Sequence, residues 1–204
     1  MSARLLLASG NAHKLSELRR LVAGAGLDLT VSGLSDLACW SDPVEDGATF
    51  EDNALIKAEA GHRATGGAVL ADDSGLEVDV LGRMPGVRSA RWAGPGASDQ
   101  DNLDLVLRQL ADVEPARRGA RFVCAVALVQ PTRPPVVLRR AVEGVVLTSP
   151  RGENGFGYDP IFLPDGFDLT TAEMSAAQKD AISHRGQALR ALLPDLALIG
   201  ADSD

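Results

Sequence analysis

The sequence predicts an α/β fold in which helices flank one mixed β-sheet. Apolar runs of strand length alternate with stretches of helical periodicity, which is typical of strands joined by crossover helices. Two long apolar runs, 122–129 and 136–147, are separated only by a proline-rich turn, which indicates an antiparallel hairpin. Crossovers and a hairpin together predict a mixed sheet. The length of 204 residues suits a single domain, 1–204.

Element boundaries follow from apolar periodicity and from capping residues. Thr49 and Asp52 have the spacing of a capping box, as do Ser175 and Gln178, and Gly24 stops the first helix. We expect strands over 5–8, 29–31, 68–71 and 76–81, helices over 13–23, 49–64, 101–110 and from Thr170 onward, and loops over 34–48 and 82–95.

Composition limits the class of protein. Apolar residues make up 45% and charged residues 24%, which is typical of a globular protein and excludes disorder, collagen and coiled coil. The net charge of −8 argues against general nucleic-acid binding, which needs a basic face. The longest apolar run, 122–129, is far shorter than the roughly 20 residues of a membrane helix. No export signal is visible, so we expect a cytoplasmic protein without membrane or nucleic-acid partners.

Cysteine and histidine spacing indicates no zinc-type site. Cys39 and Cys124 lie far apart, and Cys124 falls in an apolar run that predicts a buried, inert thiol. His13, His62 and His184 are too scattered for a helical pair of ligands. A metal would therefore have to be held by carboxylates.

Only three of the 20 basic residues are lysines, namely Lys14, Lys57 and Lys179. So strong a preference for arginine indicates a coding bias that removes lysine from indifferent surface positions. We therefore expect each remaining lysine to have a specific task.

A first candidate site lies where the first strand meets the first helix. Backbone N–H groups and the positive end of the helix dipole favour a phosphate there, although the spacing is not that of a P-loop. The segment consists of Ser9, Gly10, Asn11, Ala12, His13 and Lys14. On the second helix, Asn53 and Lys57 share a face four residues apart. The alternative for the segment 9–14 is an ordinary turn between a strand and a helix, and the alternative for Lys57 is a solvated surface lysine.

The strongest local feature is the segment 72–75 (Asp-Asp-Ser-Gly), which follows an apolar strand. Two adjacent carboxylates near a core are costly unless a cation or hydrogen-bond donors offset their charge. Such oxygen ligands suit Mg²⁺, which binds one or two carboxylates, waters and substrate phosphates. Glu45 or Asp46 would supply a further carboxylate. The alternative is a turn whose aspartates cap local N–H groups.

Two segments in the second half combine polar residues with glycine. In 155–160 (Gly-Phe-Gly-Tyr-Asp-Pro) the glycines let a flat ligand approach, Phe156 suits stacking on a base, and Asp159 suits a ring N–H or a ribose. Residues 183–186 (Ser-His-Arg-Gly) open the last helix, where free N–H groups face a ligand. Core aromatics in a strand-edge turn, and an N-cap followed by surface residues, are the alternatives. All these features together describe a nucleotide site.

These motifs, in this order, resemble the non-canonical purine nucleoside triphosphate pyrophosphatases (inosine/xanthosine triphosphate pyrophosphatase, HAM1-like family). The resemblance spans almost the whole chain, and all three lysines fall on its positions. Its motifs are Leu6–Lys14, Glu45–Ala58, Ala71–Leu76, Pro85–Arg91, Gly155–Pro160 and Ser183–Gly186. The departures are small: Ser9 stands where many relatives have threonine, Arg88 where an aromatic residue is common, and 165–170 is irregular.

The resemblance implies an elongated two-lobed α/β structure, a mixed β-sheet flanked by helices with the active cleft between the lobes, in a homodimer. The implied reaction is hydrolysis of ITP, dITP and XTP to the nucleoside monophosphate and pyrophosphate, with Mg²⁺ as cofactor. This reaction would keep deaminated purines out of DNA and RNA.

The resemblance also implies roles for individual residues. Asp73 is the proton acceptor and, with Glu45, holds the Mg²⁺. The implied substrate-binding residues are Ser9, Gly10, Asn11, Ala12, His13, Lys14 and Lys57 at the triphosphate, Asp72 near the metal, Ser74 lining the substrate, and Phe156, Gly157, Tyr158, Asp159, Lys179, His184 and Arg185 at the base and sugar. Donors such as His184 and Arg185 would favour the 6-oxo group of hypoxanthine and xanthine over the amino group of adenine.

Two other functions stay open at the level of the sequence. One is a pyrophosphatase of other modified or canonical triphosphates. The other is a nucleotide-binding regulator without turnover, which has no need of the paired Asp72 and Asp73. A scaffold protein would explain none of the charged clusters.

Overall fold

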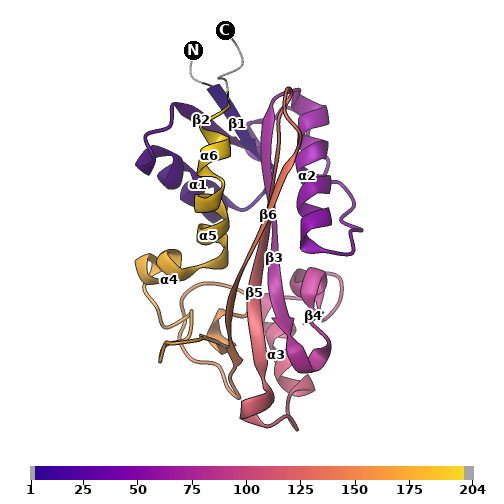
Figure 1. Cartoon of the computed structure of the whole chain (residues 1–204). Coiled ribbons are helices and arrows are strands. Elements are labelled where there is room, and N and C mark those ends of the chain that lie inside the picture. Colours follow the sequence, from indigo (N-terminus) through magenta and orange to yellow (C-terminus); the bar gives the residue numbers. More distant parts are fainter. Residues whose placement is uncertain (1–2, 200–204) are drawn as a thin grey trace. The chain divides into compact units, whose positions relative to one another are not determined.

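A computed structural model of the chain describes residues 3–199 and confirms the mixed α/β fold (Figure 1). The strands are β1 (Ala3–Leu7), β2 (Leu29–Gly33), β3 (Ala68–Val78), β4 (Met84–Pro85), β5 (Gly119–Val129), β6 (Val136–Val146) and β7 (Phe162–Pro164). Within the described residues they form one seven-stranded sheet in the order β2-β1-β3-β5-β6-β7, with β4 paired to β3. Strand β1 runs parallel to β2 and β3, whereas β4 is antiparallel to β3 and β7 is antiparallel to β6.

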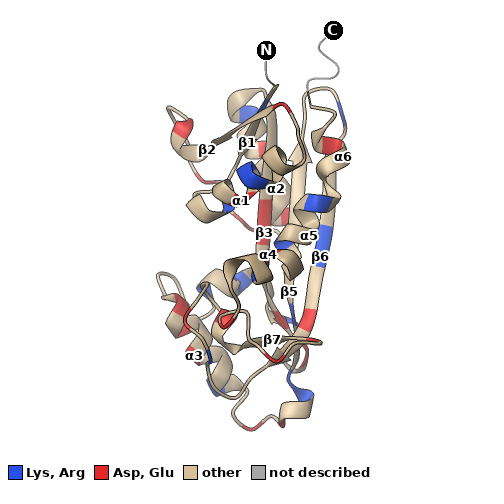
Figure 2. Ribbon diagram, turned by 90° about the vertical axis from the view of Figure 1, so that its left-hand side faces the viewer, with Lys and Arg blue, Asp and Glu red and all other residues tan. Residues whose placement is uncertain are grey.

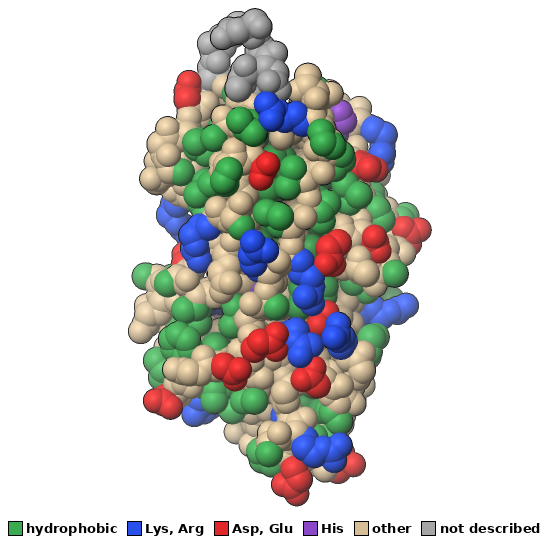
Figure 3. Space-filling view, viewed as in Figure 1, with side chains coloured by type: hydrophobic (Ala, Val, Ile, Leu, Met, Phe, Trp, Pro, Cys, Tyr) green, Lys and Arg blue, Asp and Glu red, His purple; other side chains and the backbone are tan. Residues whose placement is uncertain are grey.

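The first four helices begin after capping side chains, those of Asn11, Thr49, Ser98 and Ser175. They are α1 (Ala12–Gly24), α2 (Phe50–Thr65), α3 (Asp99–Gln109), α4 (Ala176–Ile182), α5 (His184–Ala191) and α6 (Leu193–Leu196), and the 3-10 turns are η1 (Leu34–Asp36), η2 (Asp79–Leu81), η3 (Gly86–Arg91), η4 (Pro115–Arg117) and η5 (Asp159–Ile161). The capping boxes expected at Thr49 and Ser175 are both present. In the described part of the chain, none of the helices is long and apolar enough to cross a membrane. Acidic and basic side chains intermingle over the face in Figure 3, whose described part carries no broad basic patch.

The chain divides into two compact units. Unit 1 contains residues 1–73, 125–139 and 188–204, and unit 2 contains residues 74–124 and 140–187. The division cuts β3 directly after Asp73, so the paired aspartates belong to unit 1 and Ser74 to unit 2.

The core of unit 1 forms around the parallel strands β1, β2 and β3. Leu5 on β1 aligns with Val31 on β2 and with Ala68 on β3. Leu5, Leu70 and the α1 residue Leu18 are fully buried. In Figure 1, α1 and α2 lie on opposite sides of these strands.

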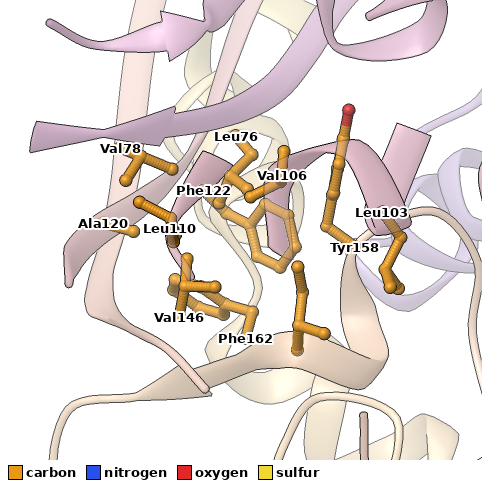
Figure 4. Packing of buried hydrophobic residues seen from close by; sticks show 11 residues of the cluster. Leu76, Val78, Leu103, Val106, Leu110, Ala120, Phe122, Val146, Tyr158 and Phe162 are labelled. Carbon is orange, nitrogen blue, oxygen red and sulfur yellow. The ribbon is translucent and has the colours of Figure 1, made fainter. Parts of the chain in front are cut away.

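The core of unit 2 is a cluster of eleven buried side chains (Figure 4). The rings of Phe122 on β5 and Phe162 on β7 lie 4.3 Å apart, centroid to centroid. Leu103 and Val106 attach α3 to this cluster, and the ring of Tyr158 belongs to it. Strand β5 also holds Cys124, which is buried as expected. From Ala125 onward the strand belongs to unit 1, and its residues there are also apolar.

Strand β3 departs most clearly from the sequence expectation. The expectation of two separate strands, 68–71 and 76–81, is wrong, because the backbone stays extended through one 11-residue strand, Ala68–Val78. Its acidic stretch is the red band on β3 in Figure 2. The aspartates need no turn, since lysine ammonium groups offset the charge of Asp72 and Asp73 within the strand. The alternative that they cap a turn is thereby excluded.

The expected helix from Thr170 onward is also wrong, because helix α4 begins only at Ala176. The hydroxyl of Thr170 donates to the main-chain oxygen of Arg151 at 2.8 Å, and that of Thr171 donates to the Asp159 carboxylate at 2.8 Å. These side chains anchor an irregular segment. The loop expected over 82–95 contains β4 and η3, and the helix that opens at His184 ends at Ala191 before α6 begins.

Candidate active site

The segment after β1 forms the N-terminus of α1. The Asn11 side chain caps the helix, because its oxygen accepts from the N–H groups of His13 at 2.9 Å and Lys14 at 3.3 Å. The N–H of Asn11 donates to the Ser9 hydroxyl at 3.3 Å. The cap orders Ser9 to Lys14, but it occupies two of the N–H groups at this helix terminus.

Lys14 reaches from this helix to the buried carboxylate of Asp72. Lys14 Nζ lies 2.5 Å from Asp72 Oδ2, and the Asp72 side chain is only 1% exposed. A buried carboxylate without a cation would be strongly disfavoured, so Lys14 stabilises the charged form of Asp72. The lysine side chain itself keeps 20% exposure, which leaves it accessible to a ligand.

Lys57 of α2 lies between two further carboxylates. Its Nζ is 3.3 Å from Glu45 Oε2 and 3.4 Å from Asp73 Oδ1. The alternative of a solvated lysine is excluded, since its side chain is only 14% exposed. Asn53, one turn earlier, is fully buried and donates to Asp73 Oδ2 at 3.1 Å while accepting from the N–H of Gly47 at 2.9 Å.

Gly47 permits this approach of the acidic loop to α2. A Cβ there would lie 2.6 Å from Asn53 Oδ1 and 3.0 Å from the Asn53 backbone nitrogen. Only glycine therefore lets the segment that carries Glu45 lie against the helix that carries Lys57.

Burial raises the pKa of the Asp73 carboxyl above its ordinary value of 3.8, although Lys57 and the Asn53 amide act in the opposite direction. Glu45 contributes a smaller upward effect, because its negative charge opposes ionisation of Asp73. A carboxylate with a raised pKa is a stronger proton acceptor.

Glu45 and Asp73 fit a hard cation of the kind the sequence predicts. Within residues 3–199, no group of three or more His, Cys, Asp or Glu side chains converges on one point. Mg²⁺ does not need such a group, because one or two carboxylates suffice when waters and substrate phosphates complete its shell. Glu45 and Asp73, which both contact the Lys57 ammonium group, are two carboxylates of this kind.

In unit 2, the turn 155–159 presents an exposed aromatic ring. Phe156 is 61% exposed, and Lys179 Nζ lies 5.0 Å from its ring centroid. The N–H of Phe156 donates to Asp159 Oδ2 at 2.8 Å, and Lys179 Nζ lies 2.5 Å from the same oxygen. Gly155 has φ +80°, and a Cβ there would lie 2.0 Å from Asp159 Oδ2, so the turn requires glycine.

Asp159 and Tyr158 fix this turn through hydrogen bonds to neighbouring segments. Asp159 is 3% exposed and accepts from Thr171, Lys179 and the Phe156 N–H, which uses its oxygens for internal bonds. Tyr158 is buried, its hydroxyl donates to the Ser89 main-chain oxygen at 2.8 Å, and burial raises its pKa. The geometry thus favours a supporting role for both side chains.

The start of α5 carries the remaining predicted residues. Ser183 precedes the helix, and its hydroxyl accepts from the Gly186 N–H at 2.9 Å. The His184 ring stacks on Phe122 with 5.2 Å between centroids, and Arg185 is 6% exposed. Lys179 and His184 line one small hollow in unit 2.

The predicted residues therefore gather into one set in each unit. Unit 1 brings Lys14 to Asp72, and Lys57 to Glu45 and Asp73. Unit 2 brings the turn 155–159 to Lys179. Ser74 follows Asp73 on β3 and is half-buried.

Sequence reasoning placed Asn53 on one helix face with Lys57 but gave it no role, whereas the structure shows it bonded to Asp73. Thr171 was missed, and nothing in the sequence indicated its bond to Asp159. A separate hollow of about 630 Å³ in unit 1 is lined by the starts of β1, β2 and β3, and no predicted site residue lines it. It lies at the opposite ends of these strands from the α1 N-terminus.

Comparisons with known proteins show the family of the chain. The family model described as the Ham1 family matches residues 5–195. Proteins named dITP/XTP pyrophosphatase from Cutibacterium acnes and Nocardia farcinica are each 54% identical, over 94% and 97% of this chain and 95% and 96% of their own.

Solved structures extend the likeness to the fold. A nucleoside-triphosphatase / dITP/XTP pyrophosphatase from Mycobacterium abscessus has a TM-score of 0.80 at 50% identity, covering 95% of this chain and 99% of its own. A HAM1 protein from Coxiella burnetii has a TM-score of 0.88 at 40% identity, covering 95% and 98%. With nearly its whole length matched, this chain belongs to the Ham1 family.

Proposed function

We propose that this protein hydrolyses non-canonical purine nucleoside triphosphates (ITP, dITP and XTP) to the monophosphate and pyrophosphate. The observation that carries the proposal is the arrangement of Glu45 and Asp73 around the Lys57 ammonium group. Two carboxylates for a cation and lysines for phosphate are what hydrolysis of a triphosphate requires. Relatives named dITP/XTP pyrophosphatase, identical at about half of their positions, support the substrate class.

The triphosphate is held in unit 1. The capped N-terminus of α1, from Ser9 to Lys14, provides N–H groups, the helix dipole and an ammonium group. Lys57 adds a second ammonium group beside Asp73. These charges favour a ligand with several negative oxygens.

The reaction needs one nucleophile and one leaving group. A water oxygen attacks the α-phosphorus, the bond from that phosphorus to the bridging oxygen breaks, and pyrophosphate leaves. Asp73 orients this water and accepts its proton. Lys14 and Lys57 offset the charge on the leaving pyrophosphate. Mg²⁺, held by Glu45 and Asp73, supplies Lewis-acid stabilisation of phosphate oxygens when it is bound.

The base is recognised by residues of unit 2. The exposed ring of Phe156 provides a stacking surface. His184 and Arg185 supply donors for the 6-oxo group, which adenine would leave unpaired. Sites built in this way favour the matching substrate by a factor of roughly 10⁴–10⁵ in kcat/KM, because a substrate without the 6-oxo group leaves the buried donors unpaired.

The direct test is pyrophosphate release from dITP, XTP and dGTP, with and without Mg²⁺. We expect rapid, metal-dependent turnover of dITP and XTP and slow turnover of dGTP. Comparable turnover of dGTP would favour a pyrophosphatase of broader substrate range. Binding of all three without pyrophosphate release would favour a nucleotide-binding regulator.

We also infer a homodimer that acts in the cytoplasm, on the basis of the resemblance. Light scattering coupled to gel filtration tests the assembly: a mass of twice the 21.3 kDa chain supports it, and a mass of one chain overturns it.

A further inference from the structure

The motif Pro85–Arg91 lies outside the residues assigned to substrate, yet it contacts the turn that presents Phe156. The Tyr158 hydroxyl donates to the main-chain oxygen of Ser89 at 2.8 Å, and both residues are buried. The Ser89 hydroxyl accepts from the N–H of Leu76 at 2.9 Å and donates to the main-chain oxygen of Gly86 at 2.7 Å. Ser89 is thus bonded to β3 through its side chain and to the turn through its main chain.

This arrangement depends on a close approach at Gly75. A Cβ at that position would lie 2.3 Å from Ser89 Oγ and 2.8 Å from the main-chain oxygen of Gly86. Because only glycine leaves this space, η3 contacts the strand directly after Ser74. Ser89 therefore links the turn to the part of β3 next to the predicted catalytic aspartate.

Helix α3 holds the same turn from a second direction. The N–H of Gly157 donates to Asp99 Oδ2 at 2.8 Å. Asn102, which is buried, bonds two main-chain groups of the segment 89–99, an N–H at 2.7 Å and an oxygen at 3.4 Å. That segment is therefore fixed to α3 and contacts the turn at both of its ends.

We propose that Ser89 and Asp99 are positioning residues for recognition of the purine, acting through the turn 155–159. This rests on the proposed function, in which Phe156 stacks on the base. With 61% of its surface exposed, Phe156 is held mainly by the backbone that carries it. A backbone fixed before binding lowers the entropy that the ligand must otherwise remove, and so raises affinity for the base.

The test uses binding of two ligands, dIMP, which carries the base, and inorganic tripolyphosphate, which lacks it. Asp99→Ala removes the acceptor for Gly157, whereas Asp99→Asn keeps an oxygen there. Tyr158→Phe removes only the hydroxyl that bonds Ser89. By calorimetry in Mg²⁺ buffer, we expect Asp99→Ala and Tyr158→Phe to weaken dIMP binding about three- to tenfold, the range of one hydrogen bond. Tripolyphosphate binding should not change.

Two further variants separate positioning from general damage. Asp99→Asn should bind dIMP within about twofold of the wild type, because its amide oxygen accepts from the same N–H. Asp104→Ala on the same helix, whose carboxylate accepts from the Gln100 amide at 2.8 Å, should match the wild type for both ligands.

Three results would overturn the proposal: unchanged dIMP binding in Asp99→Ala and Tyr158→Phe, an equal loss of tripolyphosphate binding, or no dIMP binding by the wild type. Since dIMP contains no phosphoanhydride bond, turnover does not enter its binding result. A wild type that binds dIMP but releases no pyrophosphate from dITP would contradict the proposed hydrolysis alone.

Discussion

The two units each hold a lysine against a buried aspartate, but the surroundings of the two pairs differ. In unit 1, the Lys14–Asp72 pair adjoins a second cluster in which Lys57 contacts two carboxylates. In unit 2, Lys179 pairs with Asp159, whose other bonds go to a threonine hydroxyl and a backbone N–H. Unit 1 thus brings two lysines and three carboxylates together, a set that suits the binding of phosphate and a cation. In unit 2, the single ion pair stabilises the turn 155–159.

The largest effect should come from removing the charge of Asp73. We expect Asp73→Asn to lower kcat about 10²–10⁴-fold, the contribution typical of a positioned proton acceptor. The fold should persist, because asparagine keeps an oxygen for the Asn53 amide. Steady-state kinetics with dITP measure this, with Asp46→Asn as the control, since Asp46 is an exposed neighbour of Glu45. A kcat within tenfold of the wild type would remove Asp73 from the chemistry.

A second prediction concerns the stability of unit 1. Lys14→Met leaves the Asp72 carboxylate, 1% exposed, without its ammonium partner and should lower the free energy of unfolding by about 1–3 kcal/mol. The control is Arg63→Met, which breaks an exposed i,i+4 pair with Glu59 and should cost about 0.5 kcal/mol or less. Urea denaturation measures both. Equal losses in the two variants would mean that burial of Asp72 does not matter.

The metal site predicts a difference between two neighbouring acidic residues. Glu45 contacts Lys57, whereas Asp46 is exposed. Glu45→Gln should raise the Mg²⁺ concentration for half-maximal activity at least about tenfold, the lower end of losses seen around metal sites. Asp46→Asn should leave it unchanged. The reverse order would assign the metal to Asp46.

In unit 2, the matching prediction separates binding from stability. Phe156→Ala should weaken dIMP binding about tenfold, because stacking on an aromatic ring contributes roughly 1–3 kcal/mol per base. Its unfolding free energy should stay near that of the wild type, since the ring is 61% exposed. Phe167→Ala is the control, a second exposed phenylalanine at 44%. A variant that loses stability without losing affinity would show that the ring is structural.

The sequence predicted the segments of the site better than the bonds that hold them. Short motifs such as 72–75 combine chemically reactive side chains within a few adjacent residues, so their spacing alone was enough to predict a candidate site. Strand β3 was predicted as two pieces because the lysines that stabilise its aspartates, Lys14 and Lys57, come from distant helices. Likewise Thr171 reaches Asp159 across 12 positions, and no local pattern encodes such a bond.

The smallest expected effect is the change in melting temperature caused by Asp73→Asn, whose sign separates the two units. Burial raises the pKa of Asp73, so the folded protein binds this proton more tightly than the unfolded chain. The stabilising effect of the bound proton is present at low pH and is lost as the pH rises from about the ordinary value of 3.8 through the raised value. Metal-free Asp73→Asn should therefore melt above the wild type at pH 7.

This gain should disappear near pH 3, where the wild-type carboxyl is protonated in both states. In unit 2, Asp159→Asn should instead melt below the wild type at pH 7, because it loses the ion pair with Lys179. For a chain of this length, each kcal/mol corresponds to roughly 2–4 °C in Tm. Opposite signs at pH 7 would show that unit 1 gives up stability for chemistry while unit 2 does not, and equal signs would remove that distinction.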